Sequence, residues 1–257
     1  MIRTDRRGAV AIVIIDRPER RNALDADHDA ALAAAILAAA ADPAVRAIVL
    51  AAEGSTFCSG ADLRDRLPAY QERVTSGESP EWSFGGITGS ERISVPIIAA
   101  INGPAIAGGL ELALACDIRI CAPEATFVMA EVRWGITPGA GGTQRLPRII
   151  GSGAALDLLL TARPMSADEA YHVGLVSRVV PAENLLDEAI SIAVAIADNA
   201  PLAVSAVRVA VTDGAALSIP EALGLERDLF LDTMRTADAR EGSKAFAEKR
   251  TPIYEGV

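Results

Sequence analysis

Two glutamates beside glycine-rich backbone are the residues of this 257-residue chain with the clearest potential for chemistry. Gly108 and Gly109 precede Glu111, and Glu131 follows twenty positions later, ahead of a second glycine-rich run at 138–142. Glycine lets another molecule approach the main chain closely, and the first amides of a helix have no partner within it, so they favour negative charge. Two carboxyl groups beside such donors could exchange protons with a substrate whose oxygen becomes an anion, as in enolate chemistry on a thioester.

Each of these features also has a simpler interpretation. Glycine pairs before apolar helices usually allow close packing, and a glutamate at a strand end is usually exposed to solvent. A further glycine-containing loop at 57–63 favours the chemical interpretation, because it follows an apolar run at 47–52 that predicts a buried parallel strand. Ligands bind at loops that leave such strands, so this loop and the one at 108–109 can each offer one amide to a single oxygen.

Short motifs along nearly the whole chain extend this pattern. They lie at 16–18, 22–24, 59–63, 96–103, 108–113, 116–117, 138–146, 174–176 and 241–250. On these residues the chain resembles the crotonase superfamily, and within it the enoyl-CoA hydratases. Each motif is short, but their order and spacing together are specific. The resemblance implies an α/β fold built as a crotonase-type spiral of repeated ββα units with a C-terminal helical region.

By the same resemblance, the amides of Ala61 and Gly108 form an oxyanion hole for a thioester carbonyl. Glu111 and Glu131 are then the catalytic carboxylates, which in the hydratases hold one water between them. The residue matching Glu111 helps to activate that water, and the one matching Glu131 delivers a proton to the α-carbon, so water adds across the double bond of a 2-enoyl-CoA. Two nearby carboxyl groups raise each other's proton affinity, which lets one be protonated while the other is charged.

Further positions match substrate-binding residues of the family. They are Arg20, Arg21, Ala23, Ser59, Asp62, Leu63, Trp134, Gly139, Phe246 and Lys249. The resemblance places Arg20 and Arg21 near the phosphates of CoA, although a basic turn is also commonly a solvated surface. Trp134 stands where relatives more often carry an aliphatic residue, and we expect it to reshape a wall near the acyl group. Phe246 and Lys249 match positions that contact the CoA of a neighbouring subunit in some relatives.

Composition narrows the classes of protein that fit. The length and a hydrophobic content of 51% suit one large α/β domain, and a formal net charge of -10 argues against a nucleic-acid partner. The three cysteines lack the spacing of a metal site or a disulfide framework, which predicts a cytoplasmic protein with no metal. No dinucleotide fingerprint is present, so we expect no cofactor beyond the coenzyme A of the substrate. The apolar run at 9–15 is too short for a signal peptide, and we expect no membrane partner.

Apolar runs alternate with helical patterns up to about residue 180, which predicts a parallel sheet with crossover helices. Strands are expected near 9–15, 46–52, 96–101, 117–122 and 175–180, and helices at 30–41 and 110–116. From about residue 184 the pattern is helical. We expect residues 1–195 to form the spiral core with the CoA-ester site and residues 196–257 to form a helical oligomerisation region, giving a homotrimer or a dimer of trimers as in the family.

The segment 67–94 differs from the rest in its clusters of glycine, serine and threonine, which predict a mobile loop. Trp82 lies within it. Our hypothesis is that this segment covers the acyl chain and influences the preferred chain length. The alternative is that Trp82 pins the loop to the core or to a neighbouring subunit.

The sequence therefore predicts an enoyl-CoA hydratase and leaves two alternatives open. One is another reaction of the same superfamily, such as double-bond isomerisation or dehydration of a specialised acyl-CoA. The other is a non-catalytic subunit that binds acyl-CoA or associates with RNA. The presence of both Glu111 and Glu131 speaks against an inactive binder, and the acidic charge speaks against RNA.

Overall fold

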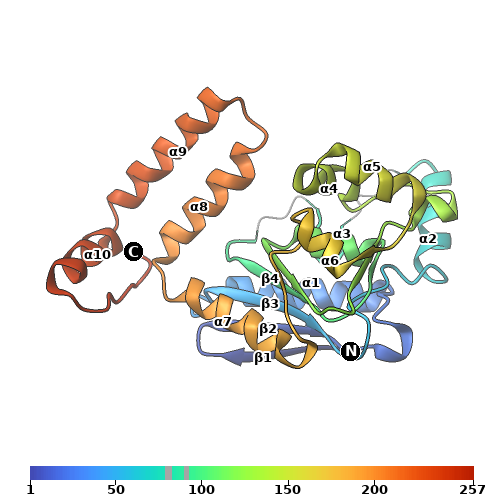
Figure 1. Cartoon of the computed structure of the whole chain (residues 1–257), viewed down its shortest axis with the longest axis horizontal. Helices are drawn as coiled ribbons and strands as arrows, with labels where there is room; N and C mark the ends of the chain where they lie inside the picture. The colour runs from blue at the N-terminus through green and yellow to red at the C-terminus, as the bar shows by residue number, and fades with distance from the viewer. Residues whose placement is uncertain (79–82, 90–92) are drawn as a thin grey trace.

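A six-stranded sheet forms the centre of the molecule in the computed structural model, which describes residues 1–78, 83–89 and 93–257 (Figure 1). Its strands, in spatial order, are β1 (Ile2–Arg7), β2 (Val10–Ile15), β3 (Ala47–Ala52), β4 (Ile97–Ile101), β6 (Ile118–Cys121) and β9 (Arg178–Val179). Neighbours from β2 to β9 are parallel, which confirms the predicted sheet and its five strands. The sequence prediction missed β1, which pairs antiparallel with β2 and is a charged, largely exposed edge strand.

The two faces of this sheet bury different sets of side chains. Alternate residues of a strand point to opposite faces, so Val13 and Ile48 enter one apolar cluster while Ile12 and Val49 enter another. Helix α1 (Ala26–Ala41) contributes to the first cluster, and α7 (Leu185–Ala197) contributes to the second. Because both faces are covered, the central strands are almost continuously hydrophobic, which is why the sequence signal for them was clear.

A second, smaller sheet joins β5 (Ala105–Ile106), β7 (Thr126–Val128) and β8 (Met165–Ser166). The chain passes from β4 of the large sheet to β5 of the small one and then to helix α3 (Gly108–Ala115). It repeats this course from β6 through β7 to α4 (Gly142–Ile150). These are the ββα units that the resemblance implied. Strands of two or three residues leave no period-two pattern, so the small sheet could not be predicted from hydrophobicity.

Two predicted helix boundaries and one predicted loop need correction. Helix α1 begins at Ala26 rather than residue 30, because the Asp25 side chain accepts a hydrogen bond from the His28 amide and caps it. Helix α3 begins at Gly108 rather than residue 110. The segment 67–94 is not a loop throughout, since α2 (Arg66–Thr75) occupies its first part. Trp82 lies outside the described residues.

Further short helices complete the body. They are η1 (Pro18–Arg20), η2 (Glu131–Trp134), α5 (Ser152–Thr161), α6 (Ala167–His172) and η3 (Ala182–Asn184). Within the described residues, no single helix is long and apolar enough to cross a bilayer, and one pair of segments, Ala182–Ala197 with Pro201–Gly214, reaches that length and composition only with a bend of 107° between them.

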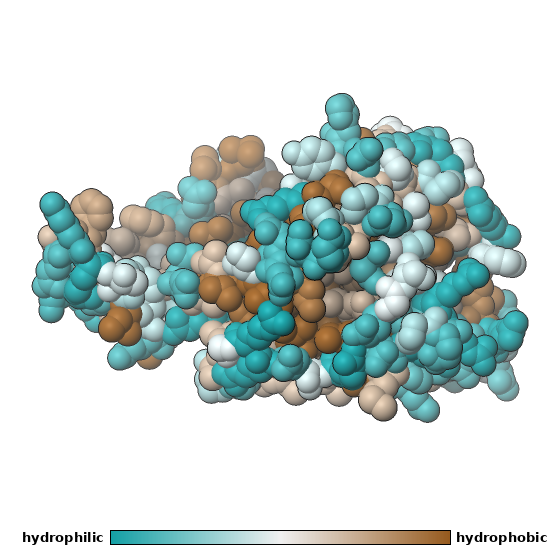
Figure 2. Space-filling view, turned by 60° about the horizontal axis from the view of Figure 1, so that its bottom comes forward, coloured by the Kyte–Doolittle hydropathy of each residue, from teal (hydrophilic) through white to brown (hydrophobic). Residues whose placement is uncertain are grey.

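The C-terminal helices α8 (Pro201–Gly214), α9 (Ile219–Met234) and α10 (Ala237–Glu248) extend away from the sheets, as Figure 1 shows. Their presence confirms the predicted helical region. Every residue of α8 and α9 is at least partly exposed, although both helices carry large apolar side chains. Figure 2 shows hydrophobic side chains gathered on one face of the molecule where this helical arm joins the body.

Candidate active site

One cavity of about 500 Å³ brings together most of the residues selected from the sequence. It is lined by Ser59, Ala61, Leu63, Gly108, Glu111, Glu131, Trp134 and Gly139 among others. These residues come from the loop after β3, the start of α3, the helix η2 and the loop before α4. The cavity therefore lies where loops leaving the parallel strands meet, as is usual for ligand sites in α/β folds.

The loops carrying Ala61 and Gly108 are in direct backbone contact. A Cβ atom at Gly60, where φ is +91°, would lie 3.0 Å from the amide nitrogen of Gly108. A Cβ atom at Gly109 would lie 2.0 Å from the carbonyl oxygen of Cys58. Glycine is required at both places because any side chain would force the loops apart. The hydrogen bond from the Ile106 amide to the Cys58 carbonyl, at 2.9 Å, fixes the two loops side by side.

Ala107 orients the peptide that carries the Gly108 amide. Its φ of 51° and ψ of -122° are unusual for a residue with a side chain, and such conformations cost about 1–3 kcal/mol. The Ala107 amide donates to the carbonyl of Val128, and its carbonyl accepts from Leu110 and Glu111, so the strained residue is held on both sides. Within residues 1–78, 83–89 and 93–257, neither the Ala61 amide nor the Gly108 amide donates a hydrogen bond. Two unused donors thus border one cavity.

Glu111 is buried at the junction of α3 and α4. Its Oε1 accepts hydrogen bonds from the amides of Ala140 and Gly142, both at 2.8 Å. Gly142 is the first residue of α4, so the carboxylate lies at a helix N-terminus, where negative charge is favoured. Burial raises the pKa of Glu111, while the two amides and the charge of Arg145 act in the opposite direction.

Glu131 occupies a different environment in the same cavity. It is 6% exposed, and neither of its carboxylate oxygens has a hydrogen-bond partner among the residues that the structure describes. Burial raises the pKa of Glu131 to about 7, and the nearby charge of Glu111 contributes to the increase. A carboxyl group with this pKa can donate a proton at neutral pH, whereas the amides at Glu111 favour its anion.

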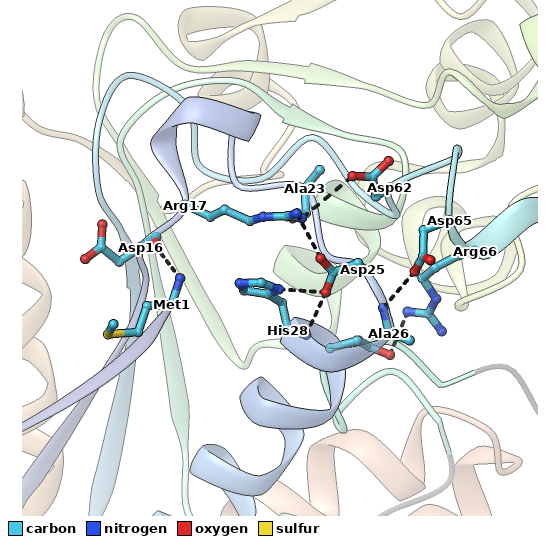
Figure 3. Close-up of polar contacts among 11 residues, drawn as sticks. Met1, Asp16, Arg17, Ala23, Asp25, Ala26, His28, Asp62, Asp65 and Arg66 are labelled. Carbon is cyan, nitrogen blue, oxygen red and sulfur yellow. Dashed lines mark hydrogen bonds and ion pairs between the residues drawn. The ribbon is translucent and has the colours of Figure 1, made fainter.

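A second, polar cavity of about 420 Å³ contains two more of the predicted binding residues, Arg20 and Asp62. In Figure 3 the guanidinium of Arg17 lies between Asp25 and Asp62, with N···O distances of 2.8 Å and 3.7 Å. Because Asp62 follows Ala61, this ion-pair cluster supports the loop that carries one free amide. Figure 3 also shows Asp65 accepting from the Ala26 amide at 3.2 Å.

The remaining predicted binding residues are distributed more widely. Arg21 is exposed, and its carbonyl accepts from the Ser59 amide at 3.1 Å, while the carbonyl of Ala23 accepts from Arg17 at 2.8 Å. Phe246, which is 88% exposed, and Lys249 lie at the end of α10 and are not among the described residues that line either cavity. Within one chain the structure does not bring them to Glu111 and Glu131.

The main cavity is also lined by side chains that were not among the predicted site residues, including Arg66, Tyr70 and Phe84. Arg66 pairs with Asp29 at 2.6 Å and lies over the Phe84 ring, 5.6 Å from its centroid. A signal was available for α2, because Leu67, Tyr70 and Val74 follow helical spacing. Phe84 belongs to the segment 67–94, which we expected from the sequence to cover the acyl chain, and its place in the cavity lining agrees with that expectation.

Fold and cavity together are those of an α/β protein with a cavity between paired loops at the ends of its parallel strands. A family model described as enoyl-CoA hydratase/isomerase matches residues 5–257, so the chain belongs to this family and has the crotonase fold. A crotonyl-CoA hydratase of Syntrophomonas wolfei is 41% identical, over 94% of this chain and 92% of its own length. A carnitinyl-CoA dehydratase of Proteus mirabilis is 38% identical, over 97% and 96%. The crystal structure of an enoyl-CoA hydratase from Bacillus anthracis superimposes with a TM-score of 0.90 at 36% identity, covering 100% of this chain and 99% of that one.

Proposed function

We propose that this enzyme adds water across the 2,3 double bond of a 2-enoyl-CoA thioester. The observation that carries the proposal is the contrast between two glutamates in one cavity. Glu111 accepts two amide hydrogen bonds, and Glu131 has unpartnered oxygens and a pKa of about 7. Such a contrast separates a general base from a general acid.

In the proposed reaction, the thioester oxygen accepts hydrogen bonds from the amides of Ala61 and Gly108. Both donors to Glu111 bind Oε1, so Oε2 is the oxygen that takes a proton from water. The water oxygen then bonds to C3, and the electron pair of the double bond moves toward the thioester oxygen, where the two amides stabilise the enolate. Glu131 gives its proton to C2, and a proton shift from Glu111 to Glu131 through the next water restores the starting state.

The names of the relatives support hydration and also favour a second candidate reaction, dehydration. The relative from Syntrophomonas wolfei is named a crotonyl-CoA hydratase, and the relative from Proteus mirabilis a carnitinyl-CoA dehydratase. Dehydration of an acyl-CoA is the reverse of the same proton transfers, so the same two carboxyl groups would serve it. The second candidate is therefore a dehydratase for a specialised 3-hydroxyacyl-CoA.

An absorbance assay tests the proposal. The purified protein is mixed with 2-enoyl thioesters from crotonyl-CoA to long-chain and aromatic members, and loss of the conjugated chromophore is followed together with the mass gain of one water. We expect turnover of at least one member. A 3-enoyl-CoA that gains absorbance would instead identify an isomerase, and a flat response to every thioester would refute hydration.

We also propose that the region 196–257 joins copies of the chain into a homotrimer or a dimer of trimers, with 1–195 as the catalytic core. The exposed apolar residues of α8 and α9 support this, because a large exposed apolar surface is typical of a protein–protein interface. In such an assembly Phe246 and Lys249 of one copy would contact the CoA bound by another. Arg20 and Arg21 would lie near its phosphates.

We also propose that the protein acts in the cytoplasm and uses no cofactor beyond the coenzyme A of its substrate. Cys58, Cys116 and Cys121 are buried free thiols, which supports a reducing compartment such as the cytoplasm. Every proton transfer in the proposed reaction is assigned to a side chain or a water, so the coenzyme A of the substrate is the cofactor moiety that we invoke.

A further inference from the structure

Arg145 lies behind the cavity wall and is hydrogen-bonded to the loop before α4, whose amides bind Glu111. It is partly buried in the first turn of α4 and is not among the described residues that line the cavity. One guanidinium nitrogen, Nη1, donates to the carbonyl of Ala140 at 3.0 Å. The guanidinium folds over Gly141, where φ is +100° and a Cβ atom would lie 2.0 Å from Nη1. The loop therefore leaves a space that the arginine fills.

This contact places Ala140 between two charged side chains. Its amide donates to Glu111 at 2.8 Å, and its carbonyl accepts from Arg145. The backbone amide of Arg145 also donates to the Gly141 carbonyl at 2.8 Å. Ala140 is therefore hydrogen-bonded on one side to the Glu111 carboxylate and on the other to the Arg145 guanidinium, which fixes the orientation of both of its peptide groups.

The second terminal nitrogen of the Arg145 guanidinium, Nη2, contacts the segment that carries Thr88 and Phe84. Nη2 donates to the carbonyl of Thr88 at 3.1 Å, and the buried Thr88 hydroxyl accepts from the Phe84 amide at 2.6 Å. The Phe84 ring is fully buried, and a Cβ atom at Gly108 would lie 3.3 Å from it. Arg145 therefore links the loop behind Glu111 to the residue that packs against the Gly108 backbone.

We propose that Arg145 is a positioning residue for the hydration reaction. It holds the Ala140 amide against the Glu111 carboxylate and the Phe84 ring against the Gly108 backbone. This inference rests on the proposed function. Among the described residues, the charged groups that act on Glu111 are Arg145 from α4 and Glu131 from η2, and Arg66 from α2 lines the same cavity. Arg145 thus also supplies positive charge opposite a second carboxyl group, which keeps Glu111 the more acidic member of the pair.

Kinetic comparison of Arg145→Gln and Arg145→Lys tests the inference on the full-length enzyme. We expect the glutamine variant to lose roughly 10- to 100-fold in kcat, because small misplacement of a catalytic group has effects of that size. KM for the thioester should change by less than about 3-fold, since the binding amides remain. Lysine keeps the charge but lacks the planar fork that reaches both carbonyls, so it should recover part of kcat. Arg148→Gln is the matched control, because Arg148 is exposed on the same helix and donates to Gln144.

The pH profile distinguishes positioning from a general structural effect. The charge of Arg145 lowers the pKa of Glu111, so its removal in Arg145→Gln should move the acid limb of the pH profile of kcat/KM to higher pH. In Arg145→Lys, which keeps the charge, this limb should stay near its wild-type position. Two results would overturn the inference. One is a wild-type kcat in the glutamine variant. The other is a loss that lysine does not relieve and that raises KM as much as it lowers kcat.

A measurement without turnover separates this inference from the proposed function. Carboxyl-labelled glutamate gives NMR titrations of the unliganded protein, and the Glu111 signal is assigned by its absence in Glu111→Gln. We expect the pKa of Glu111 to be higher in Arg145→Gln than in the wild type. If the wild type hydrates no enoyl thioester, the proposed function fails while this titration still tests Arg145. An unchanged Glu111 titration would refute the electrostatic part of its role.

Discussion

Glu111 and Glu131 show how two identical side chains in one cavity acquire different environments. The amides of Ala140 and Gly142 point at Glu111, whereas Glu131 is buried on a short 3-10 helix with no donor among the described residues. The type and order of these residues predicted a catalytic pair. The donors could not be predicted, because they are backbone amides of a loop about thirty positions away whose path depends on the packing of α3 against α4.

Replacing Glu131 by glutamine removes the proposed acid and keeps the shape of the side chain. We expect hydration to fall by roughly 10²-fold or more, with CoA-ester binding largely intact because the backbone donors remain. Steady-state kinetics on the best enoyl-CoA measure the first effect, and binding of a saturated acyl-CoA measures the second. Glu124→Gln is the control, since Glu124 is exposed and outside the cavity. Full activity in Glu131→Gln would contradict the assignment.

The same residue should make stability depend on pH. Folded Glu131 has a pKa of about 7 against an ordinary value of 4.5, so the folded state holds the proton more tightly than the unfolded chain. The free energy of unfolding therefore falls as pH rises from about 4.5 to about 7, by roughly 3 kcal/mol at most. Glutamine stays neutral, so Glu131→Gln should unfold at a higher temperature than the wild type at about pH 8 and at a similar temperature near pH 5. Equal melting temperatures at both pH values would show that Glu131 is not a strained buried carboxylate.

At the level of elements, the contact between α3 and the loop after β3 determines where the free amides lie. Gly109 lies in the first turn of this helix, with its Cα against the Cys58 carbonyl. Alanine normally stabilises a helix relative to glycine by up to about 1 kcal/mol. Here a Cβ atom would lie 2.0 Å from a backbone oxygen, so either α3 or the loop must move.

We therefore expect Gly109→Ala to destabilise the protein by about 1–3 kcal/mol and to lower hydratase activity more than 10-fold. Thermal unfolding and steady-state kinetics give the two results. Gly153→Ala is the matched control, because Gly153 also lies in the first turn of a helix, α5, and a Cβ atom added there would have no described atom within 4 Å. A stable and active Gly109→Ala enzyme would mean that the two loops are less closely coupled than the structure indicates.

The elements that the sequence predicted are those with one strong local signal. Strands β2, β3 and β4 are continuous apolar runs, and Pro201, Gly214 and Pro220 mark the breaks between α7, α8 and α9. The elements that it missed are stabilised by contacts with segments that are distant in the sequence. Strands β5, β7 and β8 exist because they pair with one another, and α2 is a short, polar helix whose apolar residues border the cavity. Pairing between distant segments is tertiary information, which local propensity does not contain.

At the level of the whole molecule, the region 1–195 holds nearly all of the buried hydrophobic residues, whereas the helical region 196–257 leaves its large apolar side chains exposed. More than half of the exposed large hydrophobic residues among those described belong to the region 196–257. Val207 and Val211 lie one turn apart on α8 and are 65% and 67% exposed. In the assembly that we propose, a second copy of the chain gives these side chains an apolar partner.

The double change Val207→Asp with Val211→Asp should separate the copies. Two unpaired carboxylates inside an apolar contact cost on the order of 2 kcal/mol each, which raises the dissociation constant about 10³-fold. Sedimentation velocity should show a trimer or hexamer for the wild type and a monomer for the variant. Kinetics should show a higher KM for the CoA thioester, because Phe246 and Lys249 would no longer reach a neighbour. Leu37→Asp is the control, since Leu37 is an exposed apolar residue of α1 in the core region. A wild-type chain that sediments as a monomer and still hydrates its substrate would show that the arm has another role and that one chain forms a complete site.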